Sequence, residues 1–306
     1  MISICVPIYN HCVVPLVQQL ADQMGHLQAS ERCEIVCIDD HSSEPFLSQN
    51  IGIGNVATYV LLEENIGRAR IRNAFLEHAK GDWMLFLDND SILPDDFLNR
   101  YLPYTADRYD VVVGGRVYDS RSDDRLHHLR YLYGTQVESR PASERSRNPY
   151  KSFMTNNFMI RRSVFERILF DTRLDKYGHE DTLFGYRLEE NKVPILHIVN
   201  PVVNGYVETN DEFLQKTVEG VESLATIYGF MQGDSRFCQS VRLLKAYGMV
   251  KRYGLVKPVY RAFAKRRAAM EQRFSEGTGF TVRQFNFYKL GLFIQNIQLQ
   301  SDNKSK

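Results

Sequence analysis

Apolar and polar positions alternate with two different periods over the first hundred residues of the chain. Short runs of consecutive apolar residues, such as Trp83–Leu87, are typical of strands buried on both faces of a parallel sheet. Between these runs, apolar residues recur with the spacing of helices that bury one face. We predict strands over residues 2–6, 34–38, 57–62 and 83–87, and helices over residues 13–27 and 69–79. Strands that alternate with helices form βαβ units, so the pattern predicts a mainly parallel sheet.

The later residues divide the chain further. We expect a strand over residues 111–113 and then a polar segment over residues 116–151. An ordered apolar stretch follows over residues 153–164, and another strand over residues 193–199. Gly114 and Gly115 end the first of these strands, and the pattern is helical from about Asp211. We therefore predict an α/β fold over residues 1–210, a Rossmann-like sheet that is mixed but mostly parallel and flanked by helices. A helical C-terminal region follows over residues 211–306.

Composition narrows the class of protein. The 38 basic and 37 acidic side chains leave the chain nearly neutral, so no general nucleic-acid partner is expected. Five cysteines are an odd number, and Cys33 and Cys37 share a predicted strand, too far apart to bridge, which indicates reduced thiols. The chain opens on a strand rather than a secretory signal, and no apolar run approaches the ~20 residues of a membrane span. We expect a cytoplasmic protein.

The C-terminal region carries an uneven charge. Residues 242–273 include ten basic side chains and one acid, Glu271, together with several large apolar side chains: Tyr253, Leu255, Val256, Tyr260 and Phe263. This composition fits an amphipathic helix that lies on anionic lipid, or a basic face that is simply solvated. No nucleic-acid-binding motif accompanies it. Peripheral contact with the inner face of a membrane is therefore one of two open alternatives.

Polar clusters follow three of the predicted strands, at residues 7–10, 39–42 and 88–90. Ligands bind outside the carboxyl ends of the strands in open α/β sheets, so the three clusters should converge on one crevice. Asp, Asn and Ser are also common in turns, which explains each cluster alone but not all three in order.

Asp88 and Asp90 lie on the same side of the extended chain, with Asn89 on the other. Two carboxylates on one side suit a hard divalent cation that keeps positions open for substrate phosphates. The sequence thus suggests Mg²⁺ or Mn²⁺ carrying a diphosphate at the end of the fourth strand.

Five motifs in order, P-I-Y-N, D-D-H-S, N-I-G-R-A-R-I-R-N, L-D-N-D and G-H-E-D, resemble those of the family 2 glycosyltransferases. The resemblance covers residues 1–210 and implies a GT-A fold with a nucleotide-binding half over residues 1–100 and an acceptor half over residues 101–210. It implies an inverting, metal-assisted transfer of a sugar from a nucleotide donor, a UDP-sugar, to a hydroxyl of a glycan or lipid-linked glycan. Assembly of a surface polysaccharide is the implied setting.

The resemblance also assigns residues to the donor. It implies that the nucleotide is bound by Pro7, Tyr9, Asn10, Asp39, Asp40, Asn65, Gly67, Arg72 and Asp88. Asp90, together with Asp88, matches the DXD motif and is implied to hold Mn²⁺ or Mg²⁺. Two departures stand out: Ser91 replaces the usual third acid, and Asn204 occupies the place of an additional metal-ligand histidine. His197 lies nearby but fits a packed histidine in a strand.

On the acceptor side, the resemblance implies that Asp181 is the catalytic base and that Glu180 orients the acceptor. One carboxylate base is what attack by a hydroxyl on the anomeric carbon requires. The alternative is a helix start with acids in its first turn. His179, Asn156 and Asn157 are the implied acceptor-binding residues, and the polar segment 116–151 either contacts the acceptor or is a solvated loop.

Other classes of protein fit less well. A sugar nucleotidyltransferase would carry a glycine-rich loop after the first strand, where I-Y-N-H-C-V-V has no glycine. A dinucleotide dehydrogenase requires three glycines between strand and helix, but Gly52 and Gly54 precede a strand. A non-catalytic nucleotide-sugar-binding protein of the same fold remains an alternative. Asn204 favours it, whereas the carboxylates of Asp88, Asp90 and Asp181 oppose it.

Overall fold

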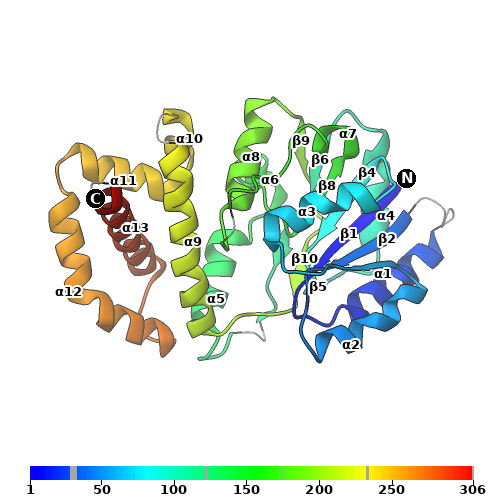
Figure 1. The fold of residues 1–306 in the computed structure, drawn as a ribbon, viewed down its shortest axis with the longest axis horizontal. Helices are drawn as coiled ribbons and strands as arrows, with labels where there is room; N and C mark the ends of the chain where they lie inside the picture. The colour runs from blue at the N-terminus through cyan, green and yellow to red at the C-terminus, as the bar shows by residue number, and fades with distance from the viewer. Residues whose placement is uncertain (28–32, 121–122, 175, 232–233, 305–306) are drawn as a thin grey trace. The chain divides into compact units, whose positions relative to one another are not determined.

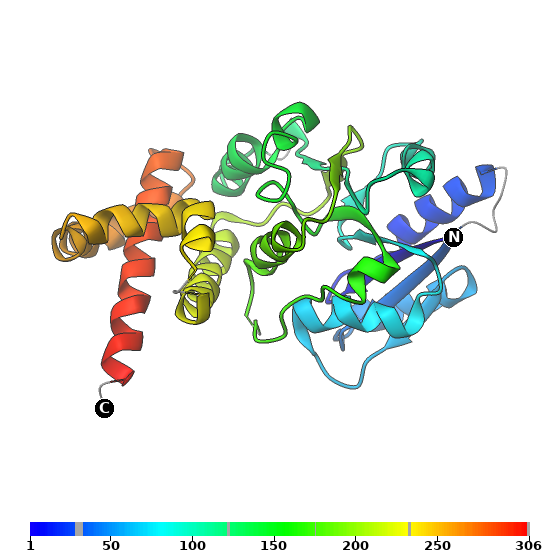
Figure 2. The same cartoon turned by 90° about the horizontal axis from the view of Figure 1, so that it is seen from above.

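The computed structural model describes residues 1–27, 33–120, 123–174, 176–231 and 234–304, and its contacts divide the chain into two compact units. The first, which we call the sheet unit, comprises residues 1–118, 138–175 and 183–206. The second, the helical unit, comprises residues 119–137, 176–182 and 207–306. Figure 1 and Figure 2 show the elements of both units.

A seven-stranded sheet with the order β3-β2-β1-β4-β8-β6-β9 is the centre of the sheet unit (Figure 1). Its strands are β1 (Ile2–Ile8), β2 (Cys33–Asp39), β3 (Thr58–Leu61), β4 (Trp83–Leu87), β6 (Val111–Val113), β8 (Asn157–Arg161) and β9 (Ile195–His197). β8 runs antiparallel to both neighbours, whereas the other pairs in this sheet are parallel. The prediction of a mixed, mostly parallel sheet is confirmed, although the strand expected over residues 193–199 is shorter.

Helices cover both faces of this sheet, because alternate residues of each central strand point to opposite faces. α1 (Val14–His26) and α4 (Phe97–Tyr101) pack on the face that carries Val6 and Leu85. α3 (Gly67–His78), α7 (Arg162–Phe165) and the later residues of α8 (Glu180–Glu190) pack on the opposite face, around Phe86. The ring of Phe86 stacks on that of Phe158 with centroids 4.9 Å apart. Burial on both faces explains why the central strands consist of consecutive apolar residues.

A smaller sheet of the same unit consists of β5 (Ser91–Ile92), β10 (Val202–Asn204) and β7 (Arg116–Val117), in the order β5-β10-β7. β5 is antiparallel to β10, and β10 is parallel to β7. Because β5 begins directly after Asp90, this sheet brings two distant segments of the chain to the carboxyl end of β4. Short helices complete the unit: α2 (Phe46–Asn50), α6 (Ala142–Arg145) and the 3-10 helices Ile51–Asn55 and Leu102–Ala106.

The helical unit consists of α5 (His128–Tyr133), α9 (Asn210–Met231), α10 (Ser235–Ser240), α11 (Arg242–Arg252), α12 (Val256–Ser275) and α13 (Val282–Lys304). α13, red in Figures 1 and 2, packs against α9, α11 and α12. Aromatic side chains fill its core, and the rings of Phe274 and Phe285 meet edge to face at 5.3 Å. The predicted helical C-terminal region is confirmed. None of the helices described is long and apolar enough to span a membrane.

One residue of the expected lipid-facing surface is placed elsewhere. Phe263 was expected among the apolar side chains of the basic stretch, but it is 1% exposed and lies 5.9 Å from the ring of Tyr288, centroid to centroid. Gly291 of α13 leaves the space that Phe263 fills, since a Cβ there would lie 2.1 Å from the Phe263 ring. Phe263 therefore belongs to the helical core, and the expectation was wrong for this residue.

Candidate active site

Three polar clusters meet at one edge of the seven-stranded sheet. β1 lies between β2 and β4 and is parallel to both, with Ile8 paired to Asp39 at their carboxyl ends. The N–H of Asp40 donates to the carbonyl of Ile8 over 2.8 Å, which continues the pairing beyond the strand. The clusters at residues 7–10, 39–42 and 88–90 thus lie at the edge where open α/β sheets bind ligands.

Asn10 joins the first cluster to the second. Its Oδ1 accepts hydrogen bonds from the N–H and the hydroxyl of Ser43 at 2.8 and 3.0 Å, and its own N–H donates to Ser42 Oγ at 2.9 Å. Pro7 lies within β1, whereas Tyr9 is 52% exposed. The exposed ring of Tyr9 offers an aromatic face at this edge, of the kind on which a planar base can stack.

Asp39 is fully buried, and both of its carboxylate oxygens are engaged. Oδ1 accepts from the N–H of Ser42, and Oδ2 accepts from the hydroxyl of Tyr59, each at 2.8 Å. Burial and the neighbouring Asp39 raise the pKa of Tyr59, so its phenol remains a donor. Each carboxylate oxygen can accept a second hydrogen bond, although the side chain of Asp39 has no exposed surface in this conformation.

Asp40 holds the start of α3, the helix that carries Arg72. Its carboxylate accepts hydrogen bonds from the N–H groups of Ile66 at 2.7 Å and Gly67 at 3.0 Å, and its backbone carbonyl accepts from Asn65 Nδ2 at 3.1 Å. Burial raises the pKa of Asp40, and the two N–H donors oppose that rise. The second and third motifs of the sequence are thus one hydrogen-bonded structure.

Asp88 is held between two arginines. Arg72 Nη2 donates to Oδ1 at 3.1 Å, and Arg116 Nη2 donates to Oδ2 at 2.9 Å. Burial alone would raise the pKa of Asp88, but Arg116 and Arg72 outweigh it and keep that pKa below its usual value. Asp88 is therefore ionised at neutral pH and balances two guanidinium groups, of which that of Arg72 is buried.

Sequence reasoning did not identify Arg116, which belongs to β7 of the small sheet. Glu138 Oε2 lies 3.9 Å from Arg116 Nη1 and accepts a hydrogen bond from Tyr118 at 2.6 Å. Opposite charges thus alternate from Glu138 through Arg116 to Asp88. Gly114 and Gly115, which end β6 at the same sheet edge, were the only indication in the sequence that the next residue could reach this site.

Asp90 lies against β10, the strand that carries Asn204. Asn204 pairs with Ser91, the residue after Asp90, and the N–H of Gly205 donates to the carbonyl of Asp90 at 2.8 Å. A Cβ at Gly205 would lie 2.3 Å from that carbonyl oxygen, so only glycine fits there. Asn204 is 5% exposed and donates to the carbonyl of Tyr206. The structure thus brings Asn204, one of the two departures from the family pattern, next to the acidic motif.

The carboxylates of the acidic motif suit a divalent cation that takes part of its coordination from a substrate. Within the residues that the structure describes, no group of three or more His, Cys, Asp or Glu side chains is arranged to hold a metal ion. Asp90 and Asp88 are two carboxylates, and both oxygens of Asp88 already accept from arginines. Mg²⁺ is typically held by one or two carboxylates together with substrate phosphates. The residues fit a cation that completes its coordination with a diphosphate, and they do not form a closed protein cage.

The side-chain amide of Asn157 makes its hydrogen bonds within the protein. Its Oδ1 accepts from the hydroxyl of Tyr101 at 2.6 Å, and its Nδ2 donates to the carbonyls of Gly115 at 3.0 Å and Asn200 at 2.8 Å. It is fully buried, so in this conformation its amide ties β8 to the segments that follow β6 and β9.

Asn156 has different surroundings. Its backbone carbonyl accepts from the N–H of Asp88 at 3.1 Å, which places it at the acidic motif. The residue is 3% exposed, and neither polar atom of its side chain has a hydrogen-bond partner among the described residues. Buried amides nearly always have partners, so a ligand or water at this position would account for the geometry.

The predicted acceptor-side carboxylates belong to the helical unit. Glu180 and Asp181 form the first turn of α8, where carboxylates are stabilised by the helix dipole. Asp181 Oδ1 accepts from the N–H of Thr182 at 2.6 Å. The helix-start interpretation therefore describes their local structure, and it does not exclude a catalytic role.

His179 precedes these carboxylates in an unusual backbone conformation, with φ of +67°. Gly178 before it has φ of +95°, and a Cβ there would lie 3.0 Å from the Cα of Gly220 on α9. Burial, and then the positive charge of Lys289, lower the pKa of His179 to about 4. His179 is neutral at physiological pH, and its Nδ1 lies 3.1 Å from the hydroxyl of Thr182.

His197 is a packed histidine, as predicted. It is 5% exposed, its Nδ1 accepts from Arg145 Nη1 at 2.7 Å, and its Nε2 donates to the carbonyl of Pro149 at 2.9 Å. Burial lowers the pKa of His197 to about 4, and the neighbouring arginine adds to that fall.

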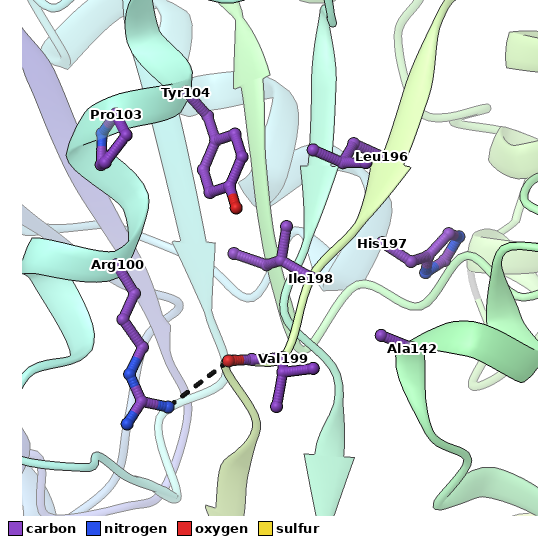
Figure 3. Close-up of a pocket in the computed structure, with 8 residues that line it drawn as sticks. All are labelled: Arg100, Pro103, Tyr104, Ala142, Leu196, His197, Ile198 and Val199. Atoms are coloured by element: carbon purple, nitrogen blue, oxygen red, sulfur yellow. Dashed lines mark hydrogen bonds between the residues drawn. The ribbon is translucent and has the colours of Figure 1, made fainter.

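A hollow of about 490 Å³ lies elsewhere on the sheet unit, beside the edge strand β9 (Figure 3). Its lining consists of Arg100, Pro103, Tyr104, Ala142 and residues 196–199. In Figure 3 the ring of His197 points away from Tyr104, and a dashed line joins Arg100 to the carbonyl of Val199, a contact of 3.4 Å. None of the residues predicted to bind donor or acceptor lines it, so we do not assign the active site to this hollow.

Comparison with known proteins identifies the family to which the chain belongs. The family model described as glycosyl transferase family 2 matches residues 3–169, a range that includes the polar clusters, both aspartates of the acidic motif and Arg116. The match covers more than half of the chain, so the chain belongs to glycosyl transferase family 2. It is a glycosyltransferase.

Two relatives show how far the likeness extends. EpsH of Bacillus subtilis strain 168, which is named as a glycosyltransferase, is 22% identical over 70% of this chain and 69% of its own length. Poly(ribitol-phosphate) beta-glucosyltransferase of Bacillus spizizenii is 26% identical over 38% of this chain and 19% of its own length.

A solved structure supports the fold. Mannosyltransferase PcManGT from Pyrobaculum calidifontis, determined in complex with GDP-Man and Mn²⁺, superposes with a TM-score of 0.61 at 16% identity. The match covers 98% of this chain and 86% of that one. At this identity the likeness concerns the fold alone, and the chain has the GT-A fold with a helical C-terminal region.

Proposed function

We propose that this glycosyltransferase moves a sugar, with inversion, from a UDP-sugar to a hydroxyl of a glycan or lipid-linked glycan. The observation that supports this most is the convergence of three polar clusters at one sheet edge, with Asp88 ionised between two arginines. A diphosphate that departs from the sugar gains negative charge, and fixed cations near it lower the barrier. The guanidinium groups of Arg72 and Arg116 at this edge are already positioned for that task.

In this proposal the nucleotide lies across the ends of β1 and β2. The base stacks on Tyr9, while Asn10 and Asp39 accept hydrogen bonds from the base and ribose. Pro7 shapes the floor of the pocket, and Asp40 holds Asn65 and Gly67 so that Arg72 points at Asp88.

Asp90, with Asp88, is proposed to hold Mn²⁺ or Mg²⁺. The metal would supply Lewis-acid stabilisation of the leaving diphosphate. Asn204 lies beside this position and offers an amide where a charged or imidazole ligand would hold the metal more tightly. PcManGT, which shares the fold, was solved with Mn²⁺, and that is consistent with metal use here.

Asp181 is proposed as the base that removes the proton of the acceptor hydroxyl, with Glu180 orienting the acceptor. Attack by that hydroxyl from the face opposite the diphosphate inverts the anomeric carbon in one step, so one carboxylate is sufficient. His179, Asn156 and Asn157 are proposed to contact the acceptor. Asn156 is the best supported of the three, because its buried amide lacks a partner among the described residues.

The five cysteines are free thiols, which supports a reducing compartment, and we propose that the enzyme acts in the cytoplasm. Polysaccharide biosynthesis at the cell envelope is the proposed setting.

Calorimetric titration of UDP, with Mn²⁺ and then with EDTA, tests the donor site. We expect UDP to bind about tenfold or more tightly when the metal is present, because the diphosphate completes the coordination of the cation. GDP serves as the matched control for base recognition. Tight binding of GDP with no binding of UDP would assign a different donor, and no binding of either nucleotide would contradict the proposed site. Release of UDP from UDP-sugars then separates a transferase from a binding protein.

A further inference from the structure

Large apolar side chains are exposed at the corner where α11 meets α12. Met249 is 52% exposed, Tyr253 is 71% exposed and Leu255 is 47% exposed. They fall within seven consecutive residues, on the last turn of α11 and the connection to α12, where Gly254 has φ of +68°. In Figure 1 this corner joins the helices labelled α11 and α12.

Cations surround this corner in the sequence. Eight basic side chains of α11, the corner and α12 are exposed: Arg242, Lys245, Lys251, Arg252, Lys257, Arg261, Lys265 and Arg266. None of the eight forms an ion pair with another residue that the structure describes, and no acidic residue occurs between residues 242 and 270. In α11, Arg242, Lys245, Met249 and Arg252 follow one another at helical spacing, so they share one face.

The opposite faces of the same helices hold the unit together. Leu244 and Tyr247 of α11 are buried, and the ring of Tyr247 lies 5.1 Å from that of Phe293 on α13, centroid to centroid. Phe263 and Phe274 are the buried residues of α12. Because these residues supply the packing, the exposed apolar residues at the corner are not needed for the core. A basic face that was only solvated would not require them either.

We propose that this corner, with its flanking cations, docks the enzyme on a bilayer surface that contains anionic lipids. Apolar side chains enter the boundary between head groups and acyl chains, while Lys and Arg remain at the level of the head-group phosphates. Tyrosine suits such a boundary because its ring is apolar and its hydroxyl is polar. The corner carries apolar side chains and unpaired positive charge together, and a bilayer surface complements both. This inference does not depend on the donor or acceptor proposed above.

Flotation of the full-length protein with vesicles tests the proposal. We expect the protein to float with vesicles of phosphatidylglycerol and phosphatidylcholine, to remain below vesicles of phosphatidylcholine alone, and to dissociate as salt is raised. Each cation near an anionic surface adds about fivefold to binding. Replacement of Lys251, Arg252 and Lys257 by Glu should therefore reduce flotation by about a hundredfold or more.

Matched variants separate the apolar corner from general effects. The corner variant replaces Met249, Tyr253 and Leu255 by Ser, and its control replaces the exposed residues Ile51, Val56 and Leu169 of the sheet unit by Ser. The charge control replaces the exposed residues Lys80, Arg108 and Arg167 by Glu. Circular dichroism and thermal unfolding confirm that each variant is folded, which is expected because every altered side chain is exposed. Only two proteins should lose flotation: the corner variant, and the variant in which Lys251, Arg252 and Lys257 are replaced by Glu. Both control variants should float as the wild type does.

Several results would overturn the proposal. Wild-type protein that fails to float with anionic vesicles has no such surface, and equal flotation of the corner variant shows that the apolar residues take no part. Equal loss in the control variants assigns the effect to overall charge or hydrophobicity. Displacement from vesicles by a single-stranded oligonucleotide, with flotation insensitive to the corner variant, would assign the basic surface to nucleic acid instead.

Discussion

A carboxylate held by two cations occurs in both units of the molecule. In the sheet unit Arg72 and Arg116 hold Asp88 at 3.1 and 2.9 Å. In the helical unit an arginine and a lysine hold Glu208 at 2.9 and 2.8 Å. The pKa of each carboxylate lies below its usual value, because the cations outweigh the effect of burial. By local geometry the two clusters are nearly the same.

Their surroundings differ. Asp88 directly follows β4 at the carboxyl edge of the sheet, where Asp90 also lies and where the buried amide of Asn156 has no hydrogen-bond partner among the described residues. Glu208 precedes α9, and its arginine partner, Arg130, lies 4.9 Å over the ring of Phe213, so this cluster fastens α5 to α9. A buried ion pair is therefore not by itself the mark of a functional site. The distinction comes from the unsatisfied polar groups nearby and from the place in the fold.

The largest expected effect follows from Asp181→Asn in the helical unit. The amide cannot accept the hydroxyl proton, so transfer should fall by about 10²–10⁴. Affinity for UDP should stay within about twofold, because the donor contacts proposed above lie in the sheet unit. Turnover of a UDP-sugar and UDP calorimetry provide the two measurements. The exposed Asp95→Asn is the matched control, and full turnover by Asp181→Asn would assign the base to another residue.

The comparison between the two clusters is tested directly by Asp88→Asn and Glu208→Gln, each of which removes one charge and little volume. Both should lower the free energy of unfolding by about 3–5 kcal/mol, since Arg72 in one cluster and Arg130 in the other are almost fully buried and lose their counter-charge. Only Asp88→Asn should also abolish metal-dependent binding of UDP. Chemical denaturation and calorimetry measure the two effects. If Asp88→Asn binds UDP as the wild type does, the cluster is structural in both units.

Acid pH gives a smaller and separable effect. The pKa of Glu208 is lowered from 4.5 to about 2 by Arg130 and Lys216, against burial, which would raise it. A carboxylate whose folded pKa is depressed stabilises the protein fully above the unfolded value, and that stability is lost as pH falls. We expect Glu208 to contribute about 3 kcal/mol above pH 4.5 and progressively less toward pH 2.

The difference in unfolding free energy between wild type and Glu208→Gln, measured as a function of pH, isolates this contribution from His179 and His197. The difference should shrink between pH 4.5 and 2. A difference that is constant over that window would show that the charge of Glu208 does not stabilise the helical unit.

How much of this could be predicted from the sequence differs between the same two regions. Consecutive apolar residues such as those of β4 identified the central strands, because burial on both faces leaves no other pattern. Ordered motifs then placed Asp39, Asp88 and Asp90 at one edge, since parallel strands share their carboxyl ends. The residues of the proposed donor side could be predicted from the sequence, because their positions follow from local periodicity and one topological rule.

The rest depends on pairing between distant segments. Arg116 reaches Asp88, and Asn204 lies beside Ser91, only because β7, β10 and β5 form a small sheet from strands of two or three residues. Strands this short carry no readable period. In the helical unit, Phe263 looked like a surface residue because its neighbours are basic, but the space left by Gly291 on another helix decides its place.

The smallest expected effect tests that small sheet, through the contact of β10 with the acidic motif. In Gly205→Ala the new Cβ would lie 2.3 Å from the carbonyl oxygen of Asp90, so the backbone must shift. We expect a loss of about 1–3 kcal/mol in stability, as for other overpacked sites, and a loss of about tenfold in the effect of Mn²⁺ on UDP affinity. Gly54→Ala is the matched control, because a Cβ there meets nothing within 4 Å. Thermal unfolding and calorimetry of the two variants measure both quantities. If the variant weakens folding but leaves the metal dependence of UDP binding unchanged, that result would mean that Asp90 is not a metal ligand. The charged cluster of the sheet unit would then resemble that of the helical unit, where the charges only stabilise the fold.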